Sequence, residues 1–356
     1  MPDASTSSLV SLDHEELVIR RGRRSGVYTI VGVHSTARGP ALGGCRMWRY
    51  QSSADGARDA LRLSRAMTFK AAAAGLPLGG GKGVICAEPG KPPTGRRRRD
   101  VLLDFADSVN ALEGRYVTAE DVGTSSTDMA TIAEGTEHVT GLSKARGGSG
   151  DPSPFTARGV EAAMRACCER RFGSRELKGR TVALVGAGHV GTRLARRLAK
   201  VGAKLLMADI DPSRRELADK LPGAKWTDPS TALLAEVDVL APCALGGAID
   251  EVNVGRLRCQ VVCGAANNQL AHDGLAEDLA AHGILYGPDF IANAGGLVNI
   301  AVEIGPGGYD PKRARQRASE IEQTMREVLD RAERYDVTPL EAAYALARAR
   351  LAGAGV

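Results

Sequence analysis

Hydrophobic periodicity predicts mixed α/β structure in the first third of the chain. Apolar, β-branched runs at 16–20 and 27–33 flank a polar turn with two glycines, a pattern typical of a β-hairpin. Residues 53–74 and 101–112 place apolar side chains at the spacing of an amphipathic helix. A short apolar run at 83–86 follows a cluster of glycines and predicts another strand. We therefore expect a sheet with some antiparallel pairing, accompanied by helices.

The second half alternates helical segments with short apolar runs, which predicts a parallel sheet. A helix is expected over 156–171, followed by a strand at 181–185 and a helix over 192–201. Further strands are expected at 204–208, 237–240, 261–263 and 284–286. Towards the end, the pattern predicts one long charged helix over 311–335 and an alanine-rich helix over 339–351 that packs back on the first domain.

Length and composition are those of a two-domain globular protein. The chain has 356 residues, of which 43% are hydrophobic and 25% charged, enough to build a substantial core. A stretch rich in glycine, proline and serine at 146–154 separates the two patterns. This stretch is either a linker or a loop that a ligand approaches closely, because glycine leaves the backbone accessible.

Charge and cysteine content bear on whether the protein binds nucleic acid or metal and on the compartment in which it works. The net charge of +5 is mild, and the run Arg96–Arg99 is interpreted as a solvated loop, because it lacks the interleaved aromatic residues of single-strand nucleic-acid surfaces. Seven cysteines without a C-x-x-C pair indicate a reducing compartment and no zinc site. No apolar run is long enough to span a membrane, and residues 1–12 lack the features of a signal peptide. We therefore expect a cytoplasmic protein with no metal, nucleic-acid or membrane partner.

The segment Gly186-Ala187-Gly188-His189-Val190-Gly191 has the G-x-G-x-x-G spacing of a dinucleotide-binding turn, and it stands between a predicted strand and a predicted helix. Gly186 permits the tight turn, Gly188 lets a pyrophosphate reach the backbone, and Gly191 lets the helix pack closely on the strand. The N-terminus of the helix then favours the bound anion. His189 occupies a variable position of the motif and is not expected to be catalytic.

Asp209 ends the next predicted strand, about 20 residues after the glycines, as the motif requires. A carboxylate there accepts hydrogen bonds from the adenine-ribose hydroxyls and repels a 2′-phosphate, which predicts NAD rather than NADP as the cofactor. Arg214 and Arg215 leave an alternative open, in which they turn inward and pair with that phosphate.

A second candidate site lies in the first half of the chain, at Gly79-Gly80-Gly81-Lys82. It is not a Walker A loop, because leucine and glycine stand where that motif needs glycine and a Ser or Thr. The three glycines suggest a lysine held in crowded surroundings. Lys70, at the end of the apolar helix, is either a second functional lysine or a surface side chain. A later turn contains two carboxylates, Glu120 and Asp121, and spacing alone does not say which of them is functional.

Six stretches of sequence together resemble the amino acid dehydrogenases of the glutamate/leucine/phenylalanine/valine family, and within it the leucine and valine branch. They keep their order and span about residues 15–350. The matching stretches are Gly39-Pro40-Ala41-Leu42-Gly43-Gly44, Gly79-Gly80-Gly81-Lys82, Tyr116-Val117-Thr118-Ala119-Glu120-Asp121-Val122-Gly123-Thr124, Ala241-Pro242-Cys243-Ala244-Leu245-Gly246-Gly247, Cys263-Gly264-Ala265-Ala266-Asn267-Asn268-Gln269-Leu270 and Ala292-Asn293-Ala294-Gly295-Gly296. The arginine run and Gly83 depart from the family pattern, and neither is at a catalytic position.

The resemblance implies an α/β fold with two domains and a cleft between them. Residues 1–141 together with 333–356 would form an N-terminal α/β substrate-binding and oligomerisation domain. Residues 142–332 would form a Rossmann-like NAD-binding domain. The resemblance further implies a homo-oligomer.

Site residues also follow from the resemblance. Lys82 would be the catalytic lysine and Asp121 its acid/base partner, while Lys70 would bind the substrate carboxylate. The other substrate-side positions that the resemblance implies are Leu42, Gly44, Met67, Ala119, Asn293, Leu297 and Ile300. On the cofactor side it implies Thr156, Cys243, Ala244 and Asn267, in addition to Asp209 and the turn with Gly186, Gly188, His189, Val190 and Gly191.

The implied activity is the reversible, NAD-dependent oxidative deamination of a branched-chain L-amino acid to a 2-oxo acid, ammonia and NADH, with valine, leucine and isoleucine as the leading substrates. Leu42 and Ile300 stand where the glutamate enzymes carry a lysine and a serine, so a side-chain carboxylate would be buried unpaired. Phenylalanine-preferring relatives tend to carry a smaller residue at Leu297. A phenylalanine-preferring dehydrogenase is the alternative within the family, and an inactive NAD-sensing regulatory protein is the alternative from a different class.

Overall fold

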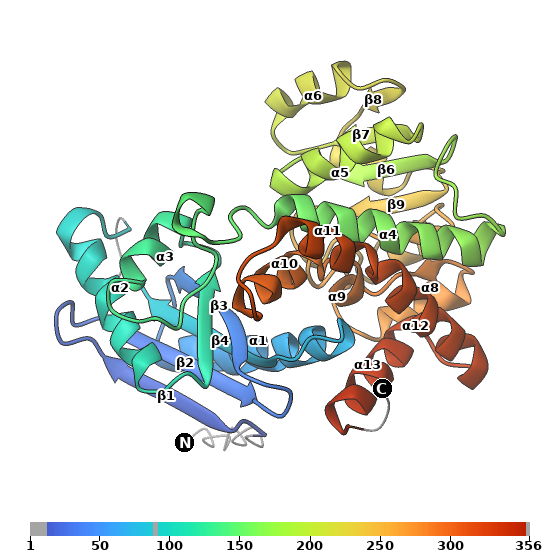
Figure 1. Ribbon diagram of the computed structural model, residues 1–356. Coiled ribbons are helices and arrows are strands. Elements are labelled where there is room, and N and C mark those ends of the chain that lie inside the picture. The colour runs from blue at the N-terminus through green and yellow to red at the C-terminus, as the bar shows by residue number, and fades with distance from the viewer. Residues whose placement is uncertain (1–12, 88–91, 354–356) are drawn as a thin grey trace, which may run out of the picture. The chain divides into compact units, whose positions relative to one another are not determined.

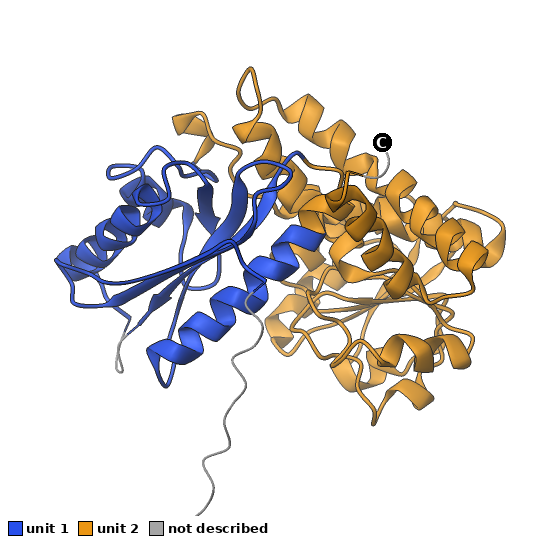
Figure 2. Cartoon of the chain, turned by 90° about the horizontal axis from the view of Figure 1, so that it is seen from below, with its two compact units in different colours: residues 1–69, 77–142 blue, residues 70–76, 143–356 orange. Residues whose placement is uncertain are grey.

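The computed structural model describes residues 13–87 and 92–353, which fall into two compact units (Figures 1 and 2). The first unit contains residues up to 69 and 77–142, and the second contains 70–76 and the chain from 143 onwards. Residues 1–12, in which the sequence predicts no signal peptide, lie outside the described residues. The expectation of a mixed α/β protein with two domains is confirmed. Residues 333–353 are grouped with the second unit, whereas the sequence assigned them to the first domain.

The first unit is built on a five-stranded mixed sheet. Its strand order is β1 (Glu16–Arg21), β2 (Tyr28–Ser35), β4 (Gly79–Cys86), β3 (Ala41–Trp48) and β5 (Tyr116–Glu120). Strands β1 and β2 form the predicted antiparallel hairpin, with Glu16 opposite Val33. Strand β4 is antiparallel to β2 and parallel to β3, and β3 is parallel to β5. The sheet therefore brings β4 and β5, which are distant in sequence, to either side of β3.

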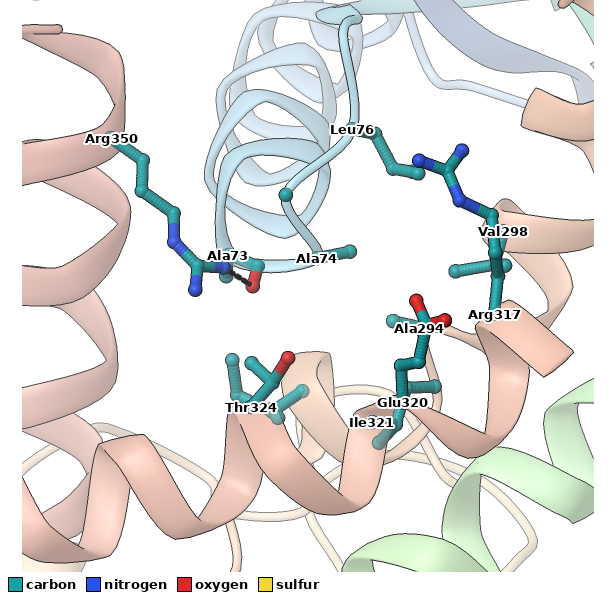
Figure 3. Close-up of a pocket in the computed structure, with 12 residues that line it drawn as sticks. Ala73, Ala74, Leu76, Ala294, Val298, Arg317, Glu320, Ile321, Thr324 and Arg350 are labelled. Atoms are coloured by element: carbon teal, nitrogen blue, oxygen red, sulfur yellow. Dashed lines mark hydrogen bonds between the residues drawn. The ribbon is translucent and has the colours of Figure 1, made fainter. Parts of the chain in front are cut away.

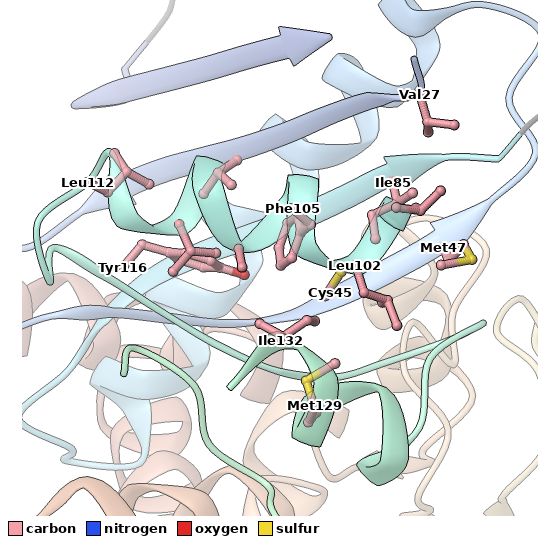
Figure 4. Packing of buried hydrophobic residues seen from close by; sticks show 14 of the residues in the cluster. Val27, Cys45, Met47, Ile85, Leu102, Phe105, Leu112, Tyr116, Met129 and Ile132 are labelled. Atoms are coloured by element: carbon pink, nitrogen blue, oxygen red, sulfur yellow. The ribbon is translucent and has the colours of Figure 1, made fainter. Parts of the chain in front are cut away.

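The two faces of this sheet have different neighbours because side chains alternate along each strand. On one face, Cys45, Ile85 and Tyr116 pack with Phe105 of α2 (Gly95–Asn110) in a core that also contains Met129 and Ile132 of α3 (Ser126–Ile132) (Figure 4). The other face, which carries the even-numbered positions of β4, is covered by α1 (Ser53–Ala73), where Val84 packs against Ala60. Lys82 is therefore on the α1 face.

Strand β4 begins at Gly79, four residues before the predicted start, so the glycine cluster is part of the strand. These positions are crowded from both sides. A Cβ atom at residue 81 would lie 2.5 Å from the ring of Tyr116, and one at residue 80 would strike the backbone of Thr68 in α1. Glycine is therefore required here for close packing. In the sequence, the same cluster of glycines looks like a loop.

The interpretation of Arg96–Arg99 as a loop is wrong, because these residues form the first turn of α2. Arg98 pairs with Asp128 at 2.6 Å and also donates to the Gly123 carbonyl at 2.9 Å. Arg99 pairs with Glu134. Arg98 and Arg99 therefore connect α2 to residues 123–134, which include α3.

The second unit contains the predicted parallel sheet, with six strands. Their order is β11 (Leu285–Tyr286), β10 (Val261–Val262), β9 (Val239–Pro242), β6 (Thr181–Val185), β7 (Lys204–Ala208) and β8 (Ala224–Trp226), and every pair is parallel. Strand β8 was not predicted from the sequence. Strands β7 and β8 are added on one side of β6, and β9, β10 and β11 on the other. The segments that follow β6 and β9 therefore lie side by side. Open parallel sheets bind ligands at such a position.

Two long helices, α4 (Ser153–Phe172) and α5 (His189–Lys200), pack against each other in this unit. The predicted single helix over 311–335 is interrupted at Glu320 and becomes α11 (Pro311–Ser319) and α12 (Ile321–Tyr335). The remaining helices are α6 (Arg215–Asp219), α7 (Pro229–Leu233), α8 (Leu275–Ala281), α9 (Asp289–Ala292), α10 (Gly295–Ile304) and α13 (Pro339–Leu351). Single 3₁₀ turns occupy Lys144–Arg146, Pro212–Arg214 and Val254–Arg256. Helix α13 packs on α12, and its Tyr344 stacks on Phe290 with ring centroids 5.1 Å apart.

The last turn of α1 is held within the second unit by α13. Arg350 donates to the Ala73 carbonyl at 2.5 Å, so a cation satisfies the free C-terminal end of the helix. A cavity of about 190 Å³ opens beside this contact, with Arg317, Glu320 and Thr324 among its lining residues (Figure 3). None of the predicted site residues lines it. Within residues 13–87 and 92–353, no helix combines the length and apolar character needed to cross a membrane.

Candidate active site

Lys82 and Asp121 form a direct ion pair in the first unit. Lys82 is on β4 and only 6% exposed, and its Nζ donates to Oδ2 of Asp121, the residue that follows β5. Strand β3 lies between their strands and carries Gly44 at the crossing. A Cβ atom at residue 44 would lie 2.7 Å from the Asp121 Cβ, so glycine is what leaves room for the carboxylate. The structure thus brings together three residues that the resemblance implied.

Arg46 extends this pair into a network that the sequence analysis missed. Its Nε donates to Asp121 Oδ2 at 3.3 Å, and its guanidinium also donates to Asp59 Oδ2 at 2.9 Å. Asp59 in turn accepts from the Tyr50 hydroxyl at 2.6 Å and from Arg62 at 2.8 Å. One signal was available, because Arg46 is two residues after Gly44 and therefore shares its face of the strand.

The charges around Asp121 keep its carboxyl ionised. Burial alone would raise the pKa of Asp121, but the charge of Lys82, its hydrogen bond and the charge of Arg46 outweigh burial, so the pKa lies below its usual value. Asp121 is therefore a hydrogen-bond acceptor at neutral pH. The arrangement suits transfer of a proton between Lys82, Asp121 and a third group.

Apolar residues of β3 and β5 lie on the same face of the sheet as the pair. Leu42 on β3 is 1% exposed and Ala119 on β5 is 3% exposed, and Gly44 is the register partner of Ala119. Met67 is half-buried on α1. The predicted pocket-lining residues of this unit are thus aliphatic or lack a side chain.

In the second unit, the glycine turn has the geometry that a dinucleotide requires. Gly186 has φ +108°, and a Cβ there would lie 2.7 Å from the Ala244 N atom, so the turn lies directly against Cys243 and Ala244. A Cβ at Gly191 would strike the Gly186 carbonyl, whereas nothing lies within 4 Å of one at Gly188. His189 and Val190 begin α5, and His189 is exposed. The open side of Gly188 at the N-terminus of α5 fits a pyrophosphate.

Asp209 directly follows β7 and is tied to this turn. Its Oδ2 accepts from the Ala187 N–H at 2.5 Å, and its Oδ1 accepts from the Asp211 N–H at 2.9 Å. Arg214 pairs with Asp211 at 3.3 Å and Arg215 with Asp219 at 4.0 Å. Both arginines are engaged by acids of their own segment, which weighs against the alternative that they receive a 2′-phosphate.

Asn293 and Asn267 meet near the carboxyl ends of β9 and β10. Asn293 is 4% exposed, and its Nδ2 donates to Asn267 Oδ1 at 2.9 Å. Its Oδ1 is buried and has no hydrogen-bond partner among the described residues. Such an atom is costly to leave unsatisfied, so it is suited to accept a hydrogen bond from a ligand.

Thr156 on α4 lies against Gly296 on α10, the residue before Leu297. A Cβ at Gly296 would lie 2.7 Å from Thr156 Oγ1, and Leu297 is the next residue. Leu297 is 7% exposed, whereas Ile300 is half-buried one turn further along α10. The predicted cofactor-side and substrate-side positions of this unit therefore adjoin one another.

Lys70, in the last turn of α1, acts electrostatically on Asp289, another residue that the sequence analysis missed. Burial raises the pKa of Asp289, and the Gln269 N–H and the charge of Lys70 only partly oppose it. Asp289 comes directly after Gly287-Pro288, a turn signal that gave no indication of a buried acid.

The chain is similar to known proteins over most of its length. Residues 14–138 match the dimerisation domain of Glu/Leu/Phe/Val dehydrogenases, and residues 206–355 match the Glutamate/Leucine/Phenylalanine/Valine dehydrogenase family. The chain is 42% identical to the leucine dehydrogenase of Thermoactinomyces intermedius over 339 residues, which covers 95% of this chain and 91% of that protein. The chain belongs to the Glu/Leu/Phe/Val dehydrogenase family.

Other members of the family support the same assignment. The valine dehydrogenase of Streptomyces virginiae is 42% identical over 96% of this chain and 94% of its own. The crystal structure of L-tryptophan dehydrogenase from Nostoc punctiforme has a TM-score of 0.82 and 35% identity, and the match covers 96% of this chain and 97% of that one. Residues 156–245 also match the NAD binding domain of D-isomer specific 2-hydroxyacid dehydrogenases. The chain is therefore an amino acid dehydrogenase that uses a nicotinamide cofactor.

Proposed function

We propose that this family member catalyses the reversible, NAD-dependent oxidative deamination of branched-chain L-amino acids. The products are the 2-oxo acid, ammonia and NADH. The observation that carries the proposal is the buried pair of Lys82 and Asp121, with Leu42 and Ala119 on the same face of the sheet. A proton-transfer pair beside aliphatic side chains suits a substrate with a reacting amine and an apolar side chain.

The glycine turn, Thr156 and Asn267 hold the cofactor in this proposal. Bound nicotinamide supplies the acceptor for the hydride that leaves the substrate Cα. The protein supplies placement: Lys70 binds the substrate carboxylate, and the unpartnered Oδ1 of Asn293 accepts a hydrogen bond from the substrate amine.

Proton transfer is assigned to the ion pair. Lys82, in its neutral form, takes a proton from the water that attacks the imine carbon, and the ammonium group so formed stabilises the oxygen of the resulting carbinolamine by a hydrogen bond. Asp121 carries the amine proton, which its ionised state permits. Arg46 is a positioning residue that fixes the Asp121 carboxylate against Lys82.

Aliphatic pocket residues set the substrate class. An acidic substrate side chain placed near Leu42 and Leu297 would lose its water without gaining a charge partner, a penalty of several kcal/mol, on the order of that for a buried unpaired ion. The similarity to leucine and valine dehydrogenases points the same way. The tryptophan dehydrogenase likeness makes aromatic substrates the competing outcome.

Asp209 selects NAD in this account. Its carboxylate, held by Ala187 and Asp211, would meet the 2′-phosphate of NADP as a like charge. We further propose a homo-oligomer assembled through the first unit, which matches a dimerisation domain, working in the cytoplasm, where its unpaired cysteines stay reduced.

The test is the formation of NADH by the purified full chain with a panel of L-amino acids. We expect kcat/KM for valine, leucine and isoleucine to exceed that for glutamate, phenylalanine and tryptophan, and NADP to be a poor replacement for NAD. A higher value for an acidic or aromatic substrate would overturn the substrate class. Binding of NADH without turnover of any amino acid would favour the inactive NAD-sensing protein.

A further inference from the structure

A cavity of about 340 Å³ in the second unit lies between α4, α5 and α11, and its lining is strongly cationic. The charged side chains that line it are Lys144, Arg158, Arg193, Arg197, Arg315 and a single acid, Asp151. None of them belongs to the predicted active site. Five cations against one anion on one small surface are unusual in a protein whose opposite charges are otherwise interspersed.

Among the residues that the structure describes, two of these cations form an ion pair with an acid. Arg193 pairs with Asp151 at 2.6 Å, and Arg197 pairs with Glu161 at 2.5 Å. Arg158 donates to the Ser319 hydroxyl at 3.2 Å and forms no ion pair within the described residues.

Arg315 and Lys144 are the remaining two cations of the cavity lining. Within residues 13–87 and 92–353, neither Arg315 nor Lys144 has an acidic partner, and both are exposed at the mouth of the cavity. Together with Arg158, three positive charges are therefore left uncompensated around one cavity.

The electrostatics of Arg158 show that these charges act on one another. The pKa of its guanidinium is lowered, first by burial and then by the charges of Arg197 and Arg315, with only Glu161 opposing them. Repulsion of this kind is relieved when an anion enters and each cation gains an opposite charge at short range.

We propose that this cavity binds a small phosphorylated metabolite that carries at least two negative charges. Guanidinium groups present two parallel N–H donors and match phosphate oxygens in a bidentate manner. The volume lies at the lower end of the range of small-molecule sites. Pro154 and Phe155 provide an apolar wall against which the organic part of the ligand can rest.

This site is distinct from the dinucleotide turn. Arg193 and Arg197 are on α5, at least two residues beyond Gly191, and no residue of the turn lines the cavity. In this proposal, NADH at the turn and a phosphorylated metabolite in the cavity therefore contact different residues along α5.

The probe is inorganic pyrophosphate, titrated calorimetrically into the full-length oligomer in phosphate-free buffer at low salt, with NADH saturating. Inorganic phosphate and ribose 5-phosphate are titrated in parallel. We expect saturable binding of pyrophosphate and of ribose 5-phosphate, one per chain, that weakens as salt is raised. Arg315→Ala and Arg158→Gln should each weaken it by tenfold or more while NADH still binds.

Arg196→Ala is the matched control, because Arg196 is exposed on the same helix as Arg193 and Arg197 and does not line the cavity. It should change the affinity for pyrophosphate less than twofold. The proposal is overturned by the absence of saturable binding, by equal losses in the Arg315 and Arg196 variants, or by displacement of pyrophosphate by NADH. Binding of the inorganic anions without ribose 5-phosphate would likewise contradict a metabolite site.

Discussion

Lys82 and Asp121 pair directly although a whole strand, β3, separates the strands that carry them. The approach depends on Gly44, where any side chain would collide with Asp121. Strand β3 is parallel to both neighbours, and its Gly44 is the register partner of Ala119, two residues before Asp121. The proposed chemistry therefore rests on sheet topology and on one missing side chain.

Arg46→Ala should impair turnover without abolishing the fold. Loss of the contact to Asp121 lets the carboxylate shift away from Lys82, and misplacement by about 1 Å costs roughly up to a hundredfold in rate. The charge of Arg46 also lowers the pKa of Asp121. Removing it should move the acid limb of the kcat/KM profile to higher pH, by roughly half to one unit.

Two further variants separate positioning from general destabilisation. Arg46→Lys keeps the positive charge. It should therefore restore part of the turnover and return the acid limb most of the way to its wild-type pH. Arg62→Ala removes another cation from Asp59, but this side chain is 60% exposed, so kcat should stay within about twofold of wild type. Equal effects of Arg46→Ala and Arg62→Ala, with no shift of the acid limb, would remove Arg46 from the account.

Asp209→Ala should weaken NAD and relieve the discrimination against NADP. The variant loses the acceptor for the ribose hydroxyls and the negative charge that opposes the 2′-phosphate. It also frees the N–H groups of Ala187 and Asp211. The measurement is kcat/KM for both cofactors with L-leucine. Wild-type enzyme that already uses both cofactors equally would show that Asp209 is not the selecting residue.

Asp104→Asn should destabilise the first unit in a pH-dependent way. The Asp104 carboxylate is buried and accepts from the Arg24 and Ser25 N–H groups and from the Ser25 hydroxyl. Burial alone would raise the pKa of Asp104, but the bonds from Ser25 and Arg24 outweigh it, and the pKa is lowered. Its contribution is thus present above the unfolded pKa of about 3.9 and is lost as pH falls through the lower folded value.

At pH 7 we expect a loss of about 2–4 kcal/mol in the free energy of unfolding, measured with urea at fixed protein concentration. The difference from wild type should shrink below about pH 4, where the wild-type carboxylate becomes protonated. Asp107→Asn is the control, because Asp107 is an exposed partner of Arg24 and should cost less than about 1 kcal/mol. A deficit of Asp104→Asn that is independent of pH would show that shape rather than charge is responsible.

Local signals in the sequence predicted much of the fold. The hairpin of β1 and β2 and the glycine turn before α5 follow from turn residues and alternation that lie within a few positions of each other. Strand β3 was not predicted, and it contains two adjacent glycines, Gly43 and Gly44, a residue type that is depleted in strands. Only its two neighbouring strands explain why glycine is needed there.

The missed parts of the site depend on contacts between distant residues. Arg46 meets Asp121 across 75 positions of sequence, and Arg158 approaches Arg315 from a different helix. Each of these arginines, taken alone, looks like an ordinary charged position in a strand or helix. The sequence contains the residues but no local pattern that brings them together.

Lys82 is the proposed proton-transfer group, and turnover of L-leucine by Lys82→Arg tests this role most directly. NADH formation is compared for the wild type and the variant above about pH 9, with NADH binding as the control for folding. Wild type should turn over, because the Lys82 amine can accept and release a proton. Arginine keeps the charge and the pairing with Asp121 but does not lose its proton in this range. We predict less than a tenth of wild-type turnover with NADH binding intact; a variant that retains more than a tenth would contradict the account.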